Sequence, residues 1–442
     1  MTDAKNKTVS KAGLAARRAA LTVVEQALAR RAGLEAALAG PAIAALDARE
    51  RAFARALAMT VLRRKGTLER TLSARLERSP PEPVLALLRL GAAQVLHLEV
   101  PAHAAVATTL DLAGEHDATR PFKGLINAVL RGLAREGAPP LPPEALAPDW
   151  LQARWRAAYG EADAAAVCAL IAEEPATDLT PKDPAEAPAL AEALEGEVLP
   201  GGQVRTRRKG DLAVWPGYAE GRWWVQDASA AVPARLLDVK PGQTALDLCA
   251  APGGKALQLA AAGATVTALD RSAARLERLK DNFARMGLEA EVVAVPAETW
   301  DDPRQFDAVL LDAPCTATGT FRRHPDVLWA ARPSDIASLA AVQARLLTVA
   351  AERVKPGGRL VYCVCSLEPE EGEAQIDAFL AARPDFRTGP PAPGEGGAPA
   401  ASLTPAGTLR ILPHHQPGGT DGFFIARLVR LPQEGTKVKS NA

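Results

Sequence analysis

From Gln243 onward, short apolar runs alternate with longer helical segments, and this alternation limits the possible folds more than any other feature. The runs are rich in Val and Leu and are bounded by Pro and Gly, as is typical of buried parallel strands. The alternation predicts a doubly wound α/β domain. Five strands are expected at residues 244–249, 265–269, 291–295, 306–311 and 359–365, and two later runs, 409–412 and 423–428, can complete the sheet.

Residues 11–136 have a helical pattern instead, with apolar side chains at three- and four-residue spacing, as at Phe53, Leu57 and Val61. We find no convincing strand there, and Gly and Pro breaks divide the region into about six helices. This pattern predicts a compact all-helical domain over residues 1–140.

The segment between the helical and α/β regions is rich in Pro at its start. Residues 137–148 have the composition of a linker or a loosely packed connection. Residues 149–235 mix helix with short expected strands at 212–215 and 223–225, which predicts a small intermediate subdomain. The catalytic domain is then expected over residues 236–432, with a mobile loop at 389–401.

The charge of the chain is unevenly distributed. Net charge is zero, but residues 1–140 hold 21 Lys and Arg against 13 Asp and Glu, so that this part carries +8 and the rest −8. A basic module beside a more acidic one fits a nucleic-acid partner, although exposed helices are commonly charged without one. Five basic residues of the helical module are candidate RNA contacts: Arg17, Arg18, Arg63, Arg64 and Lys65.

The five cysteines form an odd set without the spacing of a disulfide framework, and the first residues are polar. We therefore expect a reduced, cytoplasmic protein. The sequence has no uncharged apolar stretch of roughly 18 residues, so no membrane span is expected. A zinc site built from Cys249, Cys315, Cys363 and Cys365 would lack any Cys-x-x-Cys pair, so we expect no metal.

Two motifs place reactive side chains at the ends of expected strands, where catalytic groups of parallel sheets gather. One runs from Asp312 to Cys315 and the other begins at Cys365. A cysteine thiolate can add to C6 of a cytosine or uracil, which makes C5 nucleophilic toward a methyl donor, and a second base must then remove the C5 proton. Two thiols and one carboxyl group satisfy this requirement.

Residues 246–255, LDLCAAPGGK, join an expected strand to a helix through a turn of small residues. Such a turn lets backbone N–H groups approach a ligand, and the helix amino terminus favours a negative group. Asp270 ends the next strand, where a carboxylate can accept hydrogen bonds from two ribose hydroxyls. Cys249 and Ala256 break the P-loop pattern, and Gly-x-Gly-x-x-Gly is absent, which favours S-adenosylmethionine over other nucleotides. A turn that merely connects strand to helix is the alternative.

Four motifs, LDLCAAPGGK, LLDAPCTATGT, YCVCSLEPEE and DGFFIARL, resemble the RsmB/Sun branch of the NOL1/NOP2/Sun RNA (cytosine-C5)-methyltransferases. FRRHPDVLW, at residues 321–329, is similar to a stretch typical of the bacterial 16S rRNA enzymes, and FKGLINAVLRGLARE resembles the NusB-like RNA-binding domain of that branch. The resemblance implies an all-α NusB-like domain followed by a Rossmann-like, S-adenosylmethionine-dependent methyltransferase domain with a mostly parallel seven-stranded sheet.

The resemblance also implies roles for individual residues. Cys365 would attack C6, Cys315 would remove the C5 proton, and Asp312 would hold the cytosine edge near N3 and neighbour the cofactor. The cofactor would be bound by Asp312 together with Cys249, Ala250, Ala251, Pro252, Gly253, Gly254, Lys255 and Asp270. After the third strand only Glu298 is acidic, so no adenine contact is assigned.

Two further hypotheses concern side chains near these motifs. Lys255, or the sulfonium of the cofactor, can activate the thiol of Cys365. Cys363 stands where relatives usually carry a small residue without a thiol, and it is a redox partner, a metal ligand or a small buried side chain. Three residues after the Cys315 motif can guide phosphates or form a solvated basic turn: Arg322, Arg323 and His324.

The sequence thus predicts a monomeric 16S rRNA (cytosine-C5)-methyltransferase that forms a covalent adduct between cysteine and C6 of the base. A tRNA (cytosine-C5)-methyltransferase shares the chemical motifs and is one alternative. A non-catalytic NusB-like RNA-binding factor and a small-molecule methyltransferase are the others.

Overall fold

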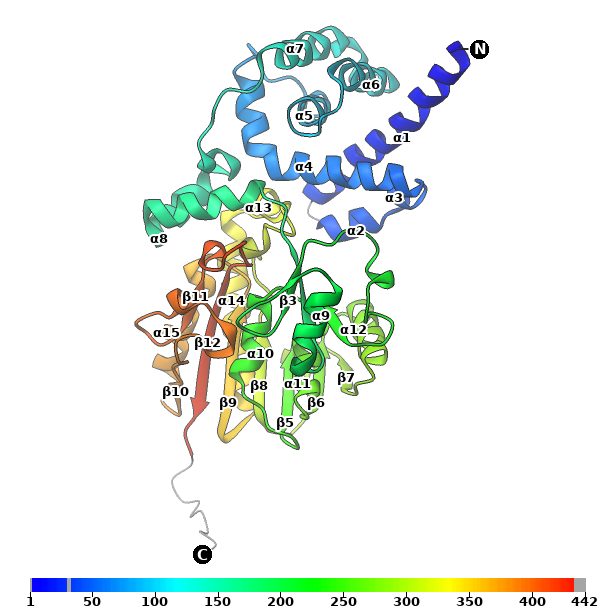
Figure 1. The fold of residues 1–442 in the computed structure, drawn as a ribbon. Helices are drawn as coiled ribbons and strands as arrows, with labels where there is room; N and C mark the ends of the chain where they lie inside the picture. Colours follow the sequence, from blue (N-terminus) through cyan, green and yellow to red (C-terminus); the bar gives the residue numbers. More distant parts are fainter. Residues whose placement is uncertain (1, 30–32, 433–442) are drawn as a thin grey trace, which may run out of the picture. The chain divides into compact units, whose positions relative to one another are not determined.

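The computed structural model describes residues 2–29 and 33–432, which fall into two compact units (Figure 1). The first unit comprises the chain up to residue 173 together with residues 321–331. The second comprises residues 174–320 and the chain from residue 332 onward. A segment that follows the Cys315 motif therefore belongs, by its contacts, to the amino-terminal unit.

The regular elements described in the first unit are all helical, as the sequence predicts. Its buried Leu, Ile, Val and Ala side chains, such as Leu57, Leu88 and Leu130, form one core. The α-helices are α1 (Thr2–Leu28), α2 (Gly33–Ala39), α3 (Pro41–Ala44), α4 (Ala48–Ser73), α5 (Glu82–His97), α6 (Ala102–Glu115), α7 (Lys123–Glu136), α8 (Asp149–Ala169) and α13 (Val327–Ala330).

The Pro-rich segment after α7 packs closely only over its last residues, so the loose connection predicted for residues 137–148 is wrong for that part, whereas residues 138–140 are exposed. Residues 143–146 form a 3-10 turn, and Ala145 and Leu146 are buried. A Cβ atom added to Gly66 of α4 would lie 2.2 Å from the backbone oxygen of Ala145, which shows how near the two backbones are. The helix α8 that follows lies in the first unit, while the division into three domains stays a prediction.

The second unit begins with a four-stranded antiparallel sheet in the order β2-β3-β1-β4. Its strands are β1 (Thr177–Pro181), β2 (Glu197–Val198), β3 (Val204–Thr206) and β4 (Trp223–Val225), accompanied by α9 (Ala187–Ala193). The strand expected at 223–225 is confirmed. The one expected at 212–215 is wrong, because the Asp211 carboxylate accepts a hydrogen bond from the Ala213 N–H and turns the backbone into a 3-10 helix.

The main sheet has eight strands in the order β10-β12-β9-β8-β5-β6-β7, with β11 paired to β12. The first five strands in sequence are parallel, and the last three pair antiparallel. They are β5 (Thr244–Leu248), β6 (Thr265–Asp270), β7 (Glu291–Ala294), β8 (Phe306–Asp312), β9 (Val354–Val364), β10 (Phe386–Thr388), β11 (Leu409–Ile411) and β12 (Phe423–Arg430).

Both faces of this sheet are buried. Ala308 and Leu310 of β8 pack into one apolar cluster, whereas Val309 and Leu311 pack into another, as alternating strand residues must. The fold class is confirmed, although the sheet has eight strands rather than seven. The helices of this domain are α10 (Val232–Leu236), α11 (Gly254–Ala261), α12 (Ala273–Met286), α14 (Pro333–Glu352) and α15 (Glu373–Ala382).

Four strands were missed by the sequence analysis. Three are β1, β2 and β3 of the small sheet, and the fourth is β10, whose three residues include Arg387 and Thr388 and carry too short an apolar pattern to recognise. The segment expected to be a mobile loop, residues 389–401, contains 3-10 turns and buries Ala398. Across the described ranges, no helix combines the length and the apolar character that crossing a bilayer requires.

Candidate active site

The two cysteine motifs meet at the carboxyl ends of β8 and β9, which are neighbouring parallel strands. Asp312 is the last residue of β8 and pairs in register with Cys363 of β9. The Ala313 N–H then donates to the Cys363 carbonyl at 3.0 Å, which extends the pairing past the strand end. The sulfur atoms of Cys315 and Cys365 consequently lie 3.5 Å apart.

A pair of glycines fixes the loops that carry the two sulfurs. The Gly319 N–H donates to the Cys365 carbonyl at 3.0 Å, and the Gly422 N–H donates to the Gly319 carbonyl at 2.8 Å. A Cβ atom on Gly319 would lie 2.1 Å from the Gly422 oxygen, so no larger residue fits there without a shift. Three loops that are distant in sequence are thereby held in contact.

Lys255, in the first turn of α11, forms an ion pair with Asp312, with 2.6 Å between Nζ and Oδ2. Burial disfavours the ammonium, but the negative charge of Asp312 and the hydrogen bond to its carboxylate outweigh burial and raise the pKa of Lys255. A cation is therefore maintained beside the thiols. The structure thus brings together the Asp312, Cys315, Lys255 and Cys365 side chains that the sequence singled out.

Cys315 holds its proton tightly. The hydrogen bond with Cys365, burial and the negative charges of Cys365 and Glu371 all raise the pKa of the Cys315 thiol well above its usual value. A protonated Cys315 can donate a hydrogen bond to the Cys365 sulfur across the 3.5 Å between the two sulfur atoms. The two thiols are therefore not equivalent.

Of the remaining thiols near the site, Cys363 is buried and Cys249 is partly buried. Cys363 is fully buried and donates to Asp312 Oδ1 at 3.5 Å, and burial followed by the charge of Asp312 raises the pKa of Cys363. Burial raises the pKa of Cys249 to about 12. These features favour the interpretation of Cys363 as a small buried side chain. Within residues 2–29 and 33–432, no group of three or more His, Cys, Asp or Glu side chains is arranged to hold a metal ion.

The small-residue turn between β5 and α11 is anchored to the end of β6. The Ala250 N–H donates to the Leu269 carbonyl at 2.9 Å, and the Ala251 N–H donates to Asp270 Oδ2 at 3.3 Å. Gly253 has a φ of 107°, which favours glycine and leads the backbone into α11. The turn predicted to bind the cofactor therefore lies at the same end of the sheet as the thiols.

Asp247, inside β5, is a site residue that our sequence analysis missed. Its carboxylate is buried, and neither oxygen has a hydrogen-bond partner among the described residues. Burial, followed by the charge of Asp312, raises the pKa of Asp247 well above its usual value. A buried carboxylate of this kind requires a donor, preferably a cationic one. The ammonium of S-adenosylmethionine is such a donor, so the residues present fit the expected cofactor.

Most of the basic residues predicted to contact RNA are held inside the first unit. Arg17 donates to Gln94 and to the Gly13 carbonyl, and Arg63 donates to the Glu173 carbonyl. Lys65 pairs with Glu69 at 2.7 Å and lies over the ring of Trp329. The predictions for these three residues are wrong, because their side chains are occupied by the fold.

The remaining candidates differ in exposure. Arg322 is only 2% exposed, so its predicted role as a phosphate guide is wrong. Burial and the positive charge of Arg323 lower the pKa of His324 to about 4, so this imidazole is neutral at pH 7. Arg18 is exposed and pairs with Glu115 at 2.5 Å. Arg323 is exposed, and its role stays a prediction.

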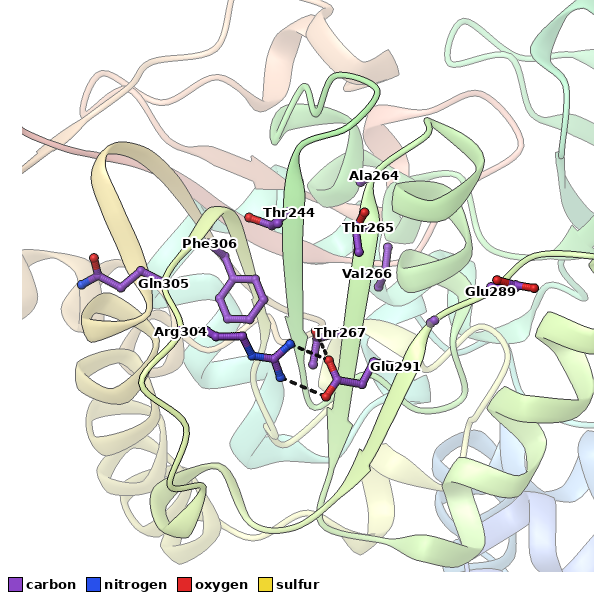
Figure 2. Close-up of a pocket in the computed structure, with 11 residues that line it drawn as sticks. Thr244, Ala264, Thr265, Val266, Thr267, Glu289, Glu291, Arg304, Gln305 and Phe306 are labelled. Carbon is purple, nitrogen blue, oxygen red and sulfur yellow. Dashed lines mark hydrogen bonds and ion pairs between the residues drawn. The ribbon is translucent and has the colours of Figure 1, made fainter.

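A cavity of about 510 Å³ opens at the opposite end of the main sheet. It is lined by the first residues of four strands, Thr244, Thr265, Glu291 and Phe306 (Figure 2). Two of its charged groups pair with each other, since Arg304 donates to both carboxylate oxygens of Glu291 at 2.7 and 2.9 Å. The cavity is therefore separate from the thiols and the cofactor turn.

Two family models match the chain, one described as 16S rRNA methyltransferase RsmB/F over residues 234–429 and one as the NusB family over residues 14–135. Ribosomal RNA small subunit methyltransferase B from Xanthomonas campestris is 38% identical over 94% of this chain and 96% of its own length. The protein of the same name from Xylella fastidiosa is 37% identical over 94% of this chain and its entire length.

Solved structures agree with these matches. The crystal structure of PH0851 superposes with a TM-score of 0.76 and 25% identity, covering 94% of this chain and 98% of that one. A methyltransferase homologue from Pyrococcus horikoshii gives a TM-score of 0.54 and 27% identity, covering 68% of this chain and 98% of its own. The chain belongs to the RsmB/F family of 16S rRNA methyltransferases and is an RNA methyltransferase that uses S-adenosylmethionine.

Proposed function

We propose that this chain methylates C5 of a cytosine in 16S rRNA, with Cys365 as the nucleophile that adds to C6 and Cys315 as the base that removes the C5 proton. The proposal is supported chiefly by the 3.5 Å separation of the two sulfur atoms. Two thiols this close can address adjacent atoms of one ring. The ion pair of Asp312 with Lys255 stands beside them.

Before the reaction, the protein has to present one thiolate and one thiol. The ammonium of Lys255 favours a thiolate at this end of the sheet, and Cys315 retains its proton. The target cytosine leaves its stack, and Asp312 holds the edge of the base near N3. The Cys365 thiolate then forms a bond to C6, and the ring becomes nucleophilic at C5.

S-adenosylmethionine supplies the methyl group when bound. The residues that would hold it are Asp270 and Asp312, the turn from Cys249 to Lys255, and Asp247 beneath that turn.

Release of the product depends on a change in Cys315. Once the Cys365 sulfur is bonded to C6 it is an uncharged thioether, so it no longer holds the Cys315 proton by its charge. Two causes of the raised pKa of Cys315, the hydrogen bond and the negative charge of Cys365, are then removed. Cys315 can then release its proton to solvent and, as the thiolate, take the C5 proton of the methylated ring. The electron pair of the C5–H bond re-forms the C5=C6 double bond, and the S–C6 bond breaks to release Cys365 as a thiolate.

Substitution of each cysteine tests the proposal. Cys365→Ser should abolish methyl transfer, because the nucleophile is lost. Cys315→Ala should allow addition but stall release, leaving protein covalently attached to RNA. Tritium transfer from labelled S-adenosylmethionine and a denaturing gel of the protein–RNA mixture measure the two outcomes. A stalled adduct in the Cys365 variant would mean reversed roles, and an active Cys365→Ser enzyme would exclude the covalent route.

The RNA substrate is proposed from the names of the relatives, which methylate small-subunit rRNA. Undermethylated 16S rRNA should accept methyl groups, whereas tRNA and free cytosine should not. Preferential transfer to tRNA would support the alternative substrate. An enzyme acting on this RNA works in the cytoplasm, and its monomeric state stays a prediction that sedimentation can check.

A further inference from the structure

A buried carboxylate that the chemistry above does not use lies beside both thiols. Glu371 ends the 3-10 turn Pro369–Glu371 and is 0% exposed. Its Oε1 accepts hydrogen bonds from the Thr316 N–H at 2.9 Å and from Gln343 Nε2 at 3.1 Å. Its Oε2 accepts from the Ser366 hydroxyl at 2.5 Å and from the Thr316 hydroxyl.

Three of the four hydrogen bonds to the Glu371 carboxylate come from the two loops that carry the reactive sulfurs. Thr316 directly follows Cys315, and Ser366 directly follows Cys365. The carboxylate therefore bridges the residue after one thiol and the residue after the other. The two hydroxyls also approach each other, with 3.2 Å between their oxygens, which closes the network.

Two further contacts make the bridge rigid. Gln343 of α14 donates from Nε2 to the Pro314 carbonyl at 2.9 Å as well as to Glu371, so the Cys315 loop is held on both sides. The Tyr362 hydroxyl, inside β9, donates to the Glu371 carbonyl at 2.6 Å. The backbone of Glu371 is thus tied to the strand that leads to Cys365.

The chemistry of a carboxylate matches this arrangement. An ionised carboxylate accepts on both oxygens, whereas an amide has one accepting oxygen and one donating nitrogen. Four donors converging on two oxygens can all be satisfied by Glu and not by Gln. Burial raises the pKa of Glu371, and the hydrogen bonds from Ser366, Thr316 and Gln343 oppose this shift by favouring the ionised form.

We propose that Glu371 is a positioning residue for methyl transfer, which acts by tying Thr316 to Ser366 and so setting the separation of the Cys315 and Cys365 sulfur atoms. This inference rests on the proposed function, because it assumes that both thiols react. Glu371 itself does not touch the reacting atoms. Its loss misplaces the thiols without removing them.

Substitution of Glu371 separates positioning from general stability. Glu371→Ala should lower kcat by about 100-fold, the effect of a misplacement of about 1 Å at reacting groups. The KM for S-adenosylmethionine should stay unchanged, because Asp247 and Asp270 are intact. Glu371→Gln should be partly active, since one oxygen still accepts from Thr316. Glu370→Gln makes the same chemical change on an exposed neighbour and should retain wild-type kcat.

Removal of the donors provides a double-mutant test that does not depend on the Glu371→Ala variant folding. Thr316→Val and Ser366→Ala each remove one side of the bridge. If Glu371 acts through them, the double variants of either with Glu371→Gln should lose less activity than the product of the separate losses. Fully multiplicative losses would contradict a shared network.

The adduct distinguishes this inference from the proposed function. In a Cys315→Ala background, which should accumulate the protein–RNA adduct, Glu371→Ala should slow adduct formation by at least about tenfold while the protein still binds S-adenosylmethionine. Adduct formation at an unchanged rate would overturn the positioning role of Glu371. Absence of any adduct in Cys315→Ala alone, with wild-type turnover in Cys365→Ser, would instead refute the covalent mechanism.

Discussion

At the scale of single residues, charge in a small buried volume decides the character of the site. Lys255 stays charged because its ion pair with Asp312 outweighs its burial. Asp247 lies in the same region with two oxygens that accept no hydrogen bond within the described chain. The carboxylate of Asp247 therefore lacks a hydrogen-bond donor among the described residues. A cationic ligand could supply that donor.

Asp247→Asn should weaken cofactor binding. It should also make the folding stability of the unliganded protein less dependent on pH. Because burial raises the folded-state pKa of Asp247, its contribution to stability is greatest below the unfolded pKa and is lost as pH rises through the folded pKa. The Asn variant removes this loss. We expect about 10- to 100-fold weaker S-adenosylmethionine binding, equivalent to one hydrogen bond to a charged group.

Calorimetric titration with S-adenosylmethionine measures the binding effect. Thermal unfolding between about pH 4 and pH 8, a range that includes ordinary carboxyl and histidine titration, measures the stability effect. Tighter binding by the Asn variant, or a steeper decline of its stability with rising pH, would contradict the assignment. Asp302→Asn is a suitable control, because Asp302 pairs with Arg304 at 2.7 Å, and Arg304 lines the cavity at the end of the sheet opposite the thiols.

At the scale of elements, the neighbouring strands β8 and β9 place their loops together, and close backbone contacts then fix the loops. Gly319 lies between the Cys365 carbonyl, to which it donates, and the Gly422 oxygen, which a Cβ atom would reach at 2.1 Å. Geometry of this kind is set by backbone approach and not by side-chain chemistry.

Gly319→Ala should therefore damage both stability and turnover. Overpacking of a tight contact costs about 1–3 kcal/mol, and the strained loop displaces the Cys365 carbonyl. Urea unfolding and steady-state methyl transfer measure the two losses. Gly132→Ala on α7 is the matched control, because an added Cβ there meets nothing within 4 Å and alanine favours a helix. An unimpaired Gly319→Ala enzyme would contradict the close approach.

At the scale of the whole molecule, the chain does not pass through its units once in order. It leaves the second unit after Thr320, packs within the first unit over residues 321–331, and returns at Arg332. Within the first unit this segment is held by Phe321, whose ring lies 6.2 Å from that of Trp155, and by Asp326, whose Oδ2 accepts from the Leu34 N–H at 3.1 Å.

Asp326→Ala should destabilise the first unit by about 1–3 kcal/mol, because it leaves the buried N–H of Leu34 without its acceptor. Hydrogen exchange at α2 and at residues 321–331 should rise together. The exposed Arg323→Ala variant should change stability by less than about 0.5 kcal/mol. Increased exchange at only one of the two segments would contradict the attachment.

The sequence alone determined the helices of the first unit, the five parallel strands of the main sheet and the reactive residues at the strand ends, but not β1, β2, β3 or β10. Apolar periodicity is a local property, so the helices of the first unit, the five parallel strands and the cysteine motifs were predictable. The resemblance added the pairing of Cys315 with Cys365, and the order of strands β8 and β9 in the sheet accounts for their proximity.

Only the tertiary structure decided which polar groups are buried and what satisfies them. Arg17, Arg63 and Arg322 are residues of a type that commonly contacts RNA, yet all three are buried. Asp247 and Glu371 carry ordinary carboxyl groups in the sequence, and their roles arise from what surrounds them. The burial of a side chain depends on residues that are distant along the chain. Thr316, for example, donates to Glu371 although 55 residues separate them, so no local sequence pattern encodes this contact.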